Sequence, residues 1–348
     1  MSAQGLYENA IAVEENLAVS FRLLLGLYLI IPLCLFLQFS DALFWGHYLR
    51  DSLPSSPTHF ILFSLFFGTP HIIASALLLT TNREYFGFYK HKVLWMTACV
   101  AVFFGLGSLY LPYKALYVMV AAWTVFHVLK QQHGVARGIC KLPSWAFHAL
   151  LGLSVAAGVL IYIGIFLKNS LTGQQSEWLQ YTSGALCAGL ILVTAICQRY
   201  VQTRFGWLFL WANTLLVVSS FYLFVHQYFL LAILVPRLVH DMTAYLFYVT
   251  HDYNRHNLEP KNSIYRWAKR WNIPVFVVLP LLSVLITFFL QQYGDWVVSV
   301  LSEYLFGFEI RKAVTLGLIG YLGLLHYYTE AFTWKNDSPY RQYIRFTR

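Results

Sequence analysis

Long uninterrupted apolar stretches recur from one end of this 348-residue chain to the other. Each is about 18 or more residues long, the length that an α-helix needs to cross the hydrocarbon core of a bilayer. Hydrophobic residues make up 58% of the chain and charged residues 11%, whereas a soluble domain carries about 25% charged residues to cover its surface. The chain is therefore expected to be an integral membrane protein, and an ordinary soluble enzyme is excluded.

These stretches predict an all-α fold, a polytopic membrane bundle of about ten transmembrane helices. The segments expected to span are 19–39, 59–80, 92–110, 112–130, 145–167, 181–198, 205–225, 228–250, 273–291 and 313–333. No linker or low-complexity tract separates them, so residues 1–348 are expected to form a single membrane domain. Residues 259–272 mix basic and aromatic side chains, a pattern typical of a helix that lies among the lipids of the inner leaflet.

Lysine and arginine indicate the orientation, because cytoplasmic loops carry an excess of positive charge. Of the 24 Lys and Arg residues, 18 fall on the side of the membrane that both termini share, and five fall on the opposite side. Both termini are therefore expected in the cytoplasm. The charges are spread over separate short loops, so the net charge of +9 does not indicate a nucleic-acid-binding surface.

Four of the 12 histidines lie in the middle or the cytoplasmic half of even-numbered predicted spans. An ionisable group at that depth costs several kcal/mol unless it is paired or solvated, which makes each one a functional candidate. The alternative for any one of them is a neutral imidazole bonded to a neighbouring helix. The four are His71, His127, His240 and His326.

The neighbours of these histidines favour a metal site. Pro70 precedes His71 and can interrupt the helical hydrogen bonds there, and Gln131 follows His127 by one turn. His326 and Glu330 stand four residues apart, so an imidazole and a carboxylate share one helical face. Such a pair can hold a metal ion, or it can form a hydrogen-bonded cap at the inner interface.

The eighth predicted span is the most polar. Arg237 and Asp241 are four residues apart and are expected to neutralise each other; alternatively, Asp241 orients a metal-bound imidazole. His240 and His251 are separated by 11 residues, about 16 Å along a helix, so one metal ion cannot bind both. Either two metal ions bind at different depths, or one of the histidines His240, His251 and His256 has another role.

The chain resembles the bacterial Brp/Blh family of integral-membrane β-carotene cleavage dioxygenases in three short motifs. These are Gly68-Thr69-Pro70-His71, then His127 or His133-Gly134, and then the run from Pro236-Arg237-Leu238 through Ala244-Tyr245 to His251-Asp252 and Arg255-His256. The chain departs from the family after His71, where Ile-Ile-Ala-Ser stands in place of a Gly-Ala-x-Asp continuation. The ending from His326 to Lys335 has no counterpart in the family.

The resemblance implies a non-haem iron centre of one or two ions, held mainly by histidines, that acts with dioxygen on a long hydrophobic substrate from the bilayer. An isoprenoid, a carotenoid or a lipid-like molecule fits that description. The expected ligands are His71, His127, His240, His251, His256, His326 and Glu330, with Asp241 as a catalytic residue. We expect an oxidoreductase of a bacterial inner membrane.

Other functions fit the same residues. A proton- or metal-coupled transporter can use Arg237, His240, Asp241 and Glu330 as a relay. A membrane acyl or glycosyl transferase needs one buried His and one Asp, and paired histidines can also ligate haem. The sequence has no P-loop, no Rossmann glycine motif and no Gly-x-Ser-x-Gly, so no motif supports those soluble chemistries. It also lacks the histidine boxes of membrane desaturases, which argues against an ordinary fatty-acid desaturase.

Overall fold

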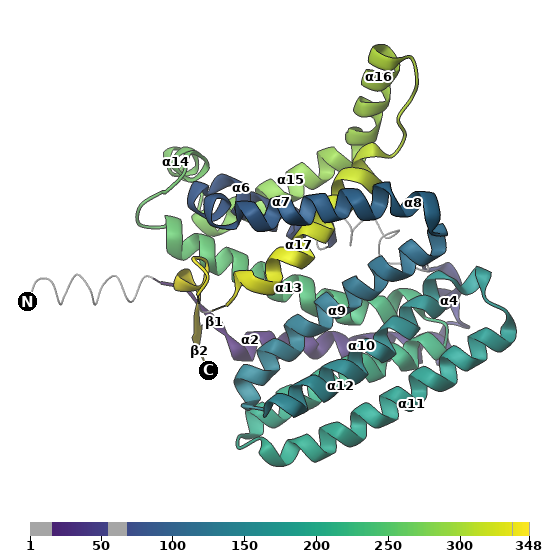
Figure 1. Cartoon of the computed structure of the whole chain (residues 1–348). Coiled ribbons are helices and arrows are strands. Elements are labelled where there is room, and N and C mark those ends of the chain that lie inside the picture. The colour runs from purple at the N-terminus through teal and green to yellow at the C-terminus, as the bar shows by residue number, and fades with distance from the viewer. Residues whose placement is uncertain (1–15, 55–67, 336, 348) are drawn as a thin grey trace, which may run out of the picture. The chain divides into compact units, whose positions relative to one another are not determined.

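The computed structural model of the chain describes residues 16–54, 68–335 and 337–347 (Figure 1). These residues are almost entirely helical, which confirms the all-α class. Within them the strands are β1 (Ala18–Ser20) and β2 (Arg345–Thr347), which pair in parallel.

The chain divides into two compact units. Unit 1 comprises Met1–Leu24, Thr69–Val100 and Thr243–Arg348, and unit 2 comprises Leu25–Gly68 and Ala101–Met242. The prediction of one membrane domain stays a prediction. Each unit is described by itself below.

Unit 2 contains the helices α3 (Ile30–Phe44), α4 (Tyr48–Ser52), α8 (Gly107–Tyr110), α9 (Tyr113–Cys140), α10 (Ser144–Phe166), α11 (Gly173–Cys197) and α12 (Arg204–Val225). Unit 1 contains α6 (Thr69–Thr81), α14 (Ser263–Arg270), α15 (Val275–Phe289), α16 (Asp295–Phe306) and α17 (Ile319–Thr333). Three helices cross the division: α2 (Phe21–Gly26), α7 (Arg83–Gly105) and α13 (Phe229–His256). Two π-helical segments, Leu290–Gly294 and Ala313–Leu318, precede α16 and α17.

Six helical segments of the described chain are long and apolar enough to cross a membrane. They are Phe21–Phe44, Ser144–Phe166, Gly173–Tyr200, Arg204–Val225, Phe229–His256 and Val275–Phe306, and Thr69–Thr81 is a shorter apolar helix. Membrane-spanning helices are thus supported, whereas the predicted count of ten is not confirmed. The predicted span 59–80 begins within 55–67, which lie outside the described residues.

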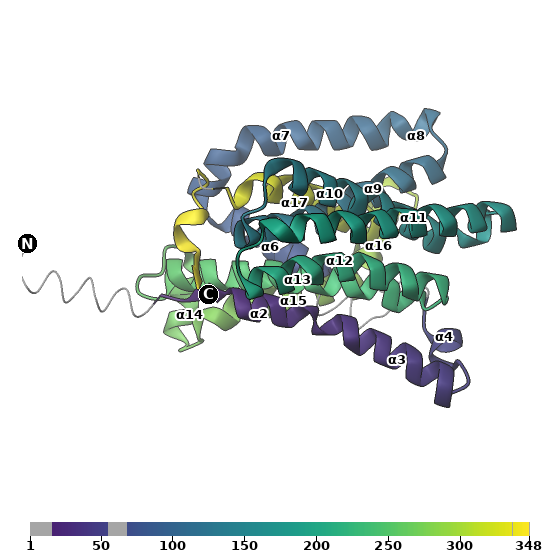
Figure 2. The same ribbon diagram turned by 90° about the horizontal axis from the view of Figure 1, so that it is seen from below.

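In unit 2, α10 packs against α9, α11 and α12, and both views show α10 and α11 side by side (Figures 1 and 2). The hydroxyls of Thr194 and Thr214 bridge α11 and α12 at 2.6 Å. Gly164 of α10 faces the ring of Phe224. A small residue and a satisfied polar pair therefore let these apolar helices approach closely, as is usual in membrane bundles.

In unit 1, α6 packs against α15 and α17. A buried group of tyrosines supports this arrangement, since the rings of Tyr85 and Tyr340 stack at 4.0 Å and the Tyr89 hydroxyl bonds to Ser338 at 2.8 Å. The predicted interfacial segment contains α14, which buries Tyr265 and leaves Trp267 exposed. Its position at a membrane surface stays a prediction.

Helix α13 is continuous through Pro236, although proline lacks an N–H and leaves the carbonyl four residues earlier without its helical partner. The Ser220 hydroxyl of α12 donates to that carbonyl, Ala232 O, at 2.6 Å. A hydroxyl from a neighbouring helix thus replaces the missing bond, and α13 carries its polar residues on one unbroken helix.

Candidate functional site

Two of the predicted ligands, His71 and His326, lie against each other in unit 1. His71 stands in the first turns of α6 and His326 in the middle of α17. Their ring centroids are 4.8 Å apart, their planes meet at 77°, and both side chains are buried. Pro70 is the second residue of α6.

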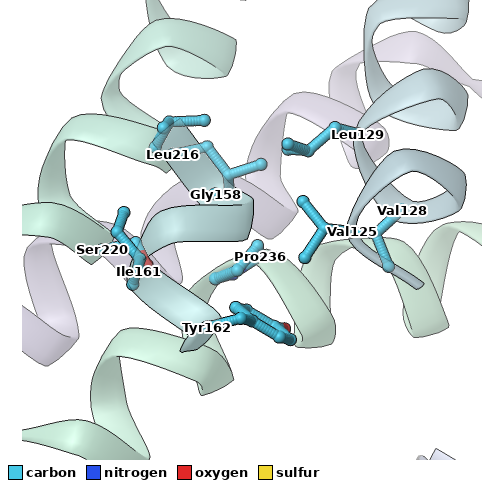
Figure 3. Close-up of a pocket in the computed structure, with 10 residues that line it drawn as sticks. Val125, Val128, Leu129, Gly158, Ile161, Tyr162, Leu216, Ser220 and Pro236 are labelled. Atoms are coloured by element: carbon cyan, nitrogen blue, oxygen red, sulfur yellow. The ribbon is translucent and has the colours of Figure 1, made fainter. Parts of the chain in front are cut away.

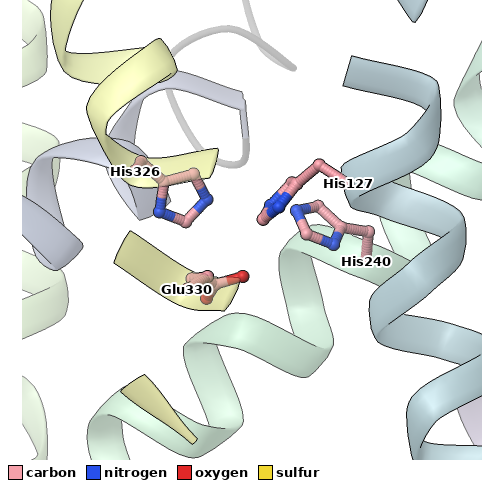
Figure 4. Close-up of side chains that lie close together, drawn as sticks. All are labelled: His127, His240, His326 and Glu330. Carbon is pink, nitrogen blue, oxygen red and sulfur yellow. The ribbon is translucent and has the colours of Figure 1, made fainter. Parts of the chain in front are cut away.

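His326 and Glu330 project from one face of α17 (Figure 4), as their spacing predicts. The Tyr248 hydroxyl donates to Glu330 Oε1 at 2.5 Å, and the Trp334 indole N–H donates to the same oxygen at 3.3 Å. His326 Nδ1 lies 3.4 Å from the Tyr248 oxygen. Since the tyrosine proton is directed at Glu330, this geometry favours the tautomer of His326 that carries its proton on Nδ1 and its lone pair on Nε2.

Unit 2 contains a second histidine pair, His127 of α9 and His240 of α13 (Figure 4). Their ring centroids are 4.7 Å apart, their planes meet at 81°, and both are buried. The predicted contact between Arg237 and Asp241 is present, with Arg237 Nε donating to Asp241 Oδ2 at 3.3 Å. His240 Nε2 is 4.0 Å from Asp241 Oδ1, beyond hydrogen-bond reach. Asp241 therefore neutralises Arg237 in an apolar helix.

His251 is held by the protein at both ring nitrogens. Tyr85 accepts a hydrogen bond from Arg255 Nη1 at 2.9 Å, so its own proton points at His251 Nε2, 2.8 Å away. His251 Nδ1 then donates to Asp252 Oδ1 at 3.2 Å. Burial raises the pKa of the Tyr85 phenol, so Tyr85 stays a neutral donor. A metal ion at His251 would have to displace Tyr85 or Asp252.

His256 is also engaged. Its Nδ1 accepts the backbone N–H of Lys261 at 3.0 Å, and its ring stacks on Tyr265 at 4.0 Å. The neutral ring then carries its proton on Nε2, which would have to leave before a metal ion could bind there. The Tyr265 hydroxyl donates to Asp252, so the ring that stacks on His256 and the imidazole of His251 both bond to the Asp252 carboxylate.

Three tyrosines of this region were missed by reasoning from the sequence: Tyr85, Tyr248 and Tyr265. Each donates to a histidine or carboxylate from a different helix or turn. Tyr248 carried the only available signal, because it stands one helical turn before His251 on the most polar span. The other two partnerships depend on tertiary packing.

His133, the alternative to His127 in the family motif, bonds to Ser154 at 2.9 Å.

The histidine and carboxylate side chains of the described chain include groups that can hold a metal ion. The side chains with suitable nitrogen or oxygen atoms are His71, His326 and Glu330 in unit 1, and His127, His240 and Asp241 in unit 2. Neutral imidazoles with few carboxylates suit iron, zinc or copper, and do not favour Mg²⁺ or Ca²⁺. Comparison with protein families, with curated proteins and with solved structures finds no match for the chain.

Proposed function

We propose that the chain is a histidine-ligated non-haem iron oxygenase that acts with dioxygen on a long hydrophobic substrate taken from the bilayer. One observation carries the proposal: each unit buries a pair of imidazoles in edge-to-face contact, His71 with His326 and His127 with His240. Buried ionisable groups in apolar helices are expensive and are usually retained for function.

The donor set fits iron. The proposed ligands are His71, His326 and Glu330 in unit 1, and His127 and His240 in unit 2. Bound iron would supply the activation of dioxygen that an organic side chain cannot. Imidazole nitrogens suit Fe(II), and the Glu330 carboxylate would offset part of the positive charge of the ion in the apolar interior.

Neighbouring side chains prepare the ligands in unit 1. Tyr248 favours the tautomer of His326 in which Nε2 presents a lone pair, and it holds the Glu330 carboxylate in place. Hydrogen bonds of this kind orient metal ligands and raise their basicity. In unit 2, Arg237 balances the charge of the Asp241 carboxylate next to His240, and the catalytic role expected of Asp241 stays a prediction.

The six apolar segments support a substrate that reaches the protein from the bilayer. A long isoprenoid, a carotenoid or an acyl chain is soluble there and offers no charge for recognition, so shape and apolar contact would select it. His251 and His256 are left out of the proposed ligand set, because both ring nitrogens of His251 bond to protein groups and the Nδ1 of His256 accepts the backbone N–H of Lys261.

A metal-coupled transporter is the second candidate, favoured by the buried Arg237–Asp241 contact within an apolar helix. Charged residues at such positions mark ion pathways in many transporters. The two functions differ in what happens to the metal: an oxygenase retains it as a resident cofactor, whereas a transporter releases it across the membrane.

Dioxygen uptake tests the proposal. Protein in lipid nanodiscs is loaded with Fe(II) under argon and mixed with oxygenated buffer and a carotenoid, an isoprenoid alcohol or an unsaturated phospholipid. We expect iron-dependent uptake with at least one of them, and its loss in His127→Ala. His133→Ala removes another buried imidazole of α9 and should retain uptake. Metal flux into proteoliposomes without dioxygen uptake would favour the transporter.

A further inference from the structure

A small, partly open apolar cavity lies among α9, α10, α12 and α13 of unit 2 (Figure 3). It offers about 20 Å³ to the centre of a water-sized sphere. Its walls include Val125, Leu129, Gly158, Ile161, Leu216 and Pro236. This volume holds a molecule of one or two heavy atoms, since about 10–15 Å³ by the same measure holds one water.

The lining disfavours water as the occupant. A buried water needs two to four polar partners, whereas the walls are mostly aliphatic, and Tyr162 and Ser220 are the lining residues with a side-chain oxygen. The hydroxyl proton of Ser220, which lies in the wall, is already donated to Ala232 O at 2.6 Å. An apolar molecule of about the size of water therefore fits the cavity better than water does.

The cavity borders both helices that carry the histidine pair of unit 2. Val128 in its wall directly follows His127 on α9, and Pro236 is one helical turn, about 6 Å along the axis, from His240 on α13. Gly158 lets α10 approach α9 closely beside the cavity, because a Cβ there would come within 2.8 Å of Val125 Cγ1.

We propose that this cavity holds dioxygen beside the His127–His240 pair. The inference rests on the proposed oxygenase function and adds a binding site to it. Dioxygen is small and apolar and dissolves in hydrocarbon, so a dry cavity within the helices of unit 2 would bind it without any hydrogen bond.

Substitutions at Val217, a buried cavity wall residue of α12, test the inference without touching a histidine. Val217→Ile adds one methyl group to the cavity, and Val217→Ala enlarges it. Val218→Ile makes the same change at the next, half-buried position, which is outside the wall. It controls for the effect of a longer side chain on α12.

Xenon is the first probe, because it binds to dry apolar cavities and needs no metal. ¹²⁹Xe NMR of the detergent-solubilised protein should report one site in the wild type, in Val217→Ala and in Val218→Ile. The signal should be lost in Val217→Ile. A xenon signal that survives in Val217→Ile would overturn the cavity assignment.

The second readout is the rate at which dissolved dioxygen oxidises bound Fe(II), followed by stopped flow. We expect this rate to fall several-fold in Val217→Ile, with unchanged iron content, and to be unchanged in Val218→Ile. Equal rates in an iron-loaded Val217→Ile would overturn the inference and leave the oxygenase proposal standing. A wild-type protein that binds no iron would overturn the oxygenase proposal, and the dioxygen assignment with it, whatever xenon does.

Discussion

The Tyr248 hydroxyl donates to the Glu330 carboxylate at 2.5 Å, and the Tyr248 oxygen also lies 3.4 Å from His326 Nδ1. One phenol thus positions both polar groups of α17. We expect Tyr248→Phe to lower the affinity for Fe(II) about 10- to 100-fold, the usual cost of losing a hydrogen bond to a metal ligand.

Anaerobic titration with Fe(II) measures this affinity. Tyr245→Phe is the matched control, because Tyr245 lies on the same helix and bonds to Ser283 at 2.9 Å. It should leave the affinity unchanged. Equal affinities in the wild type and Tyr248→Phe would mean that Tyr248 serves packing alone.

The alanine variants of His240 and His251 are expected to differ in bound iron and in stability. His240→Ala should lose bound iron. His251→Ala should retain it, but should unfold more readily by about 1–3 kcal/mol, because Tyr85 and Asp252 each lose one buried hydrogen-bond partner. Metal analysis and thermal unfolding of both variants check this. Loss of iron from a folded His251→Ala would return His251 to the ligand set.

Asp41 is expected to stabilise unit 2. Its buried carboxylate accepts hydrogen bonds from Leu49 N at 2.8 Å, Arg50 N at 3.1 Å and the Tyr228 hydroxyl at 2.9 Å. Asp41→Ala should cost about 3 kcal/mol, visible as a lower apparent melting temperature. Asp51→Ala removes an exposed carboxylate and should change it little. A melting temperature unaffected by Asp41→Ala would contradict the stabilising role of these hydrogen bonds.

The orientation can be tested by labelling single cysteines in a cysteine-free background. Arg345→Cys and Lys312→Cys occupy exposed positions in unit 1. In right-side-out vesicles, an impermeant maleimide should label residue 312 only, because the distribution of Lys and Arg places the C-terminus in the cytoplasm. Labelling of residue 345 alone would reverse the orientation.

The positions of the helices were largely predictable from the sequence, because a run of apolar residues is enough to indicate a helix in a bilayer. The relation between His326 and Glu330 was predictable for the same reason, since residues four apart share a helical face. The exact spans were less so: α7 carries Arg83, Glu84 and Lys90 and is not apolar enough to count among the six.

The partners of the polar residues could not be predicted. Tyr85 reaches His251 across 166 residues, and Tyr248 reaches Glu330 across 82. Contacts between residues so far apart in the sequence leave no local sequence pattern, because they form only when helices pack. The continuity of α13 through Pro236 could not be predicted for the same reason, since it depends on a hydroxyl from α12.

Iron content is the most direct measurement of the central claim, that buried histidines of this chain bind iron. Protein purified in detergent and reconstituted under argon with Fe(II) is desalted and measured by mass spectrometry for iron and zinc. We predict about one or two iron ions per chain, near-complete loss in the double variant His127→Ala/His326→Ala, and full retention in His133→Ala. A folded wild-type protein that retains no iron, or a double variant that retains all of it, would contradict the claim.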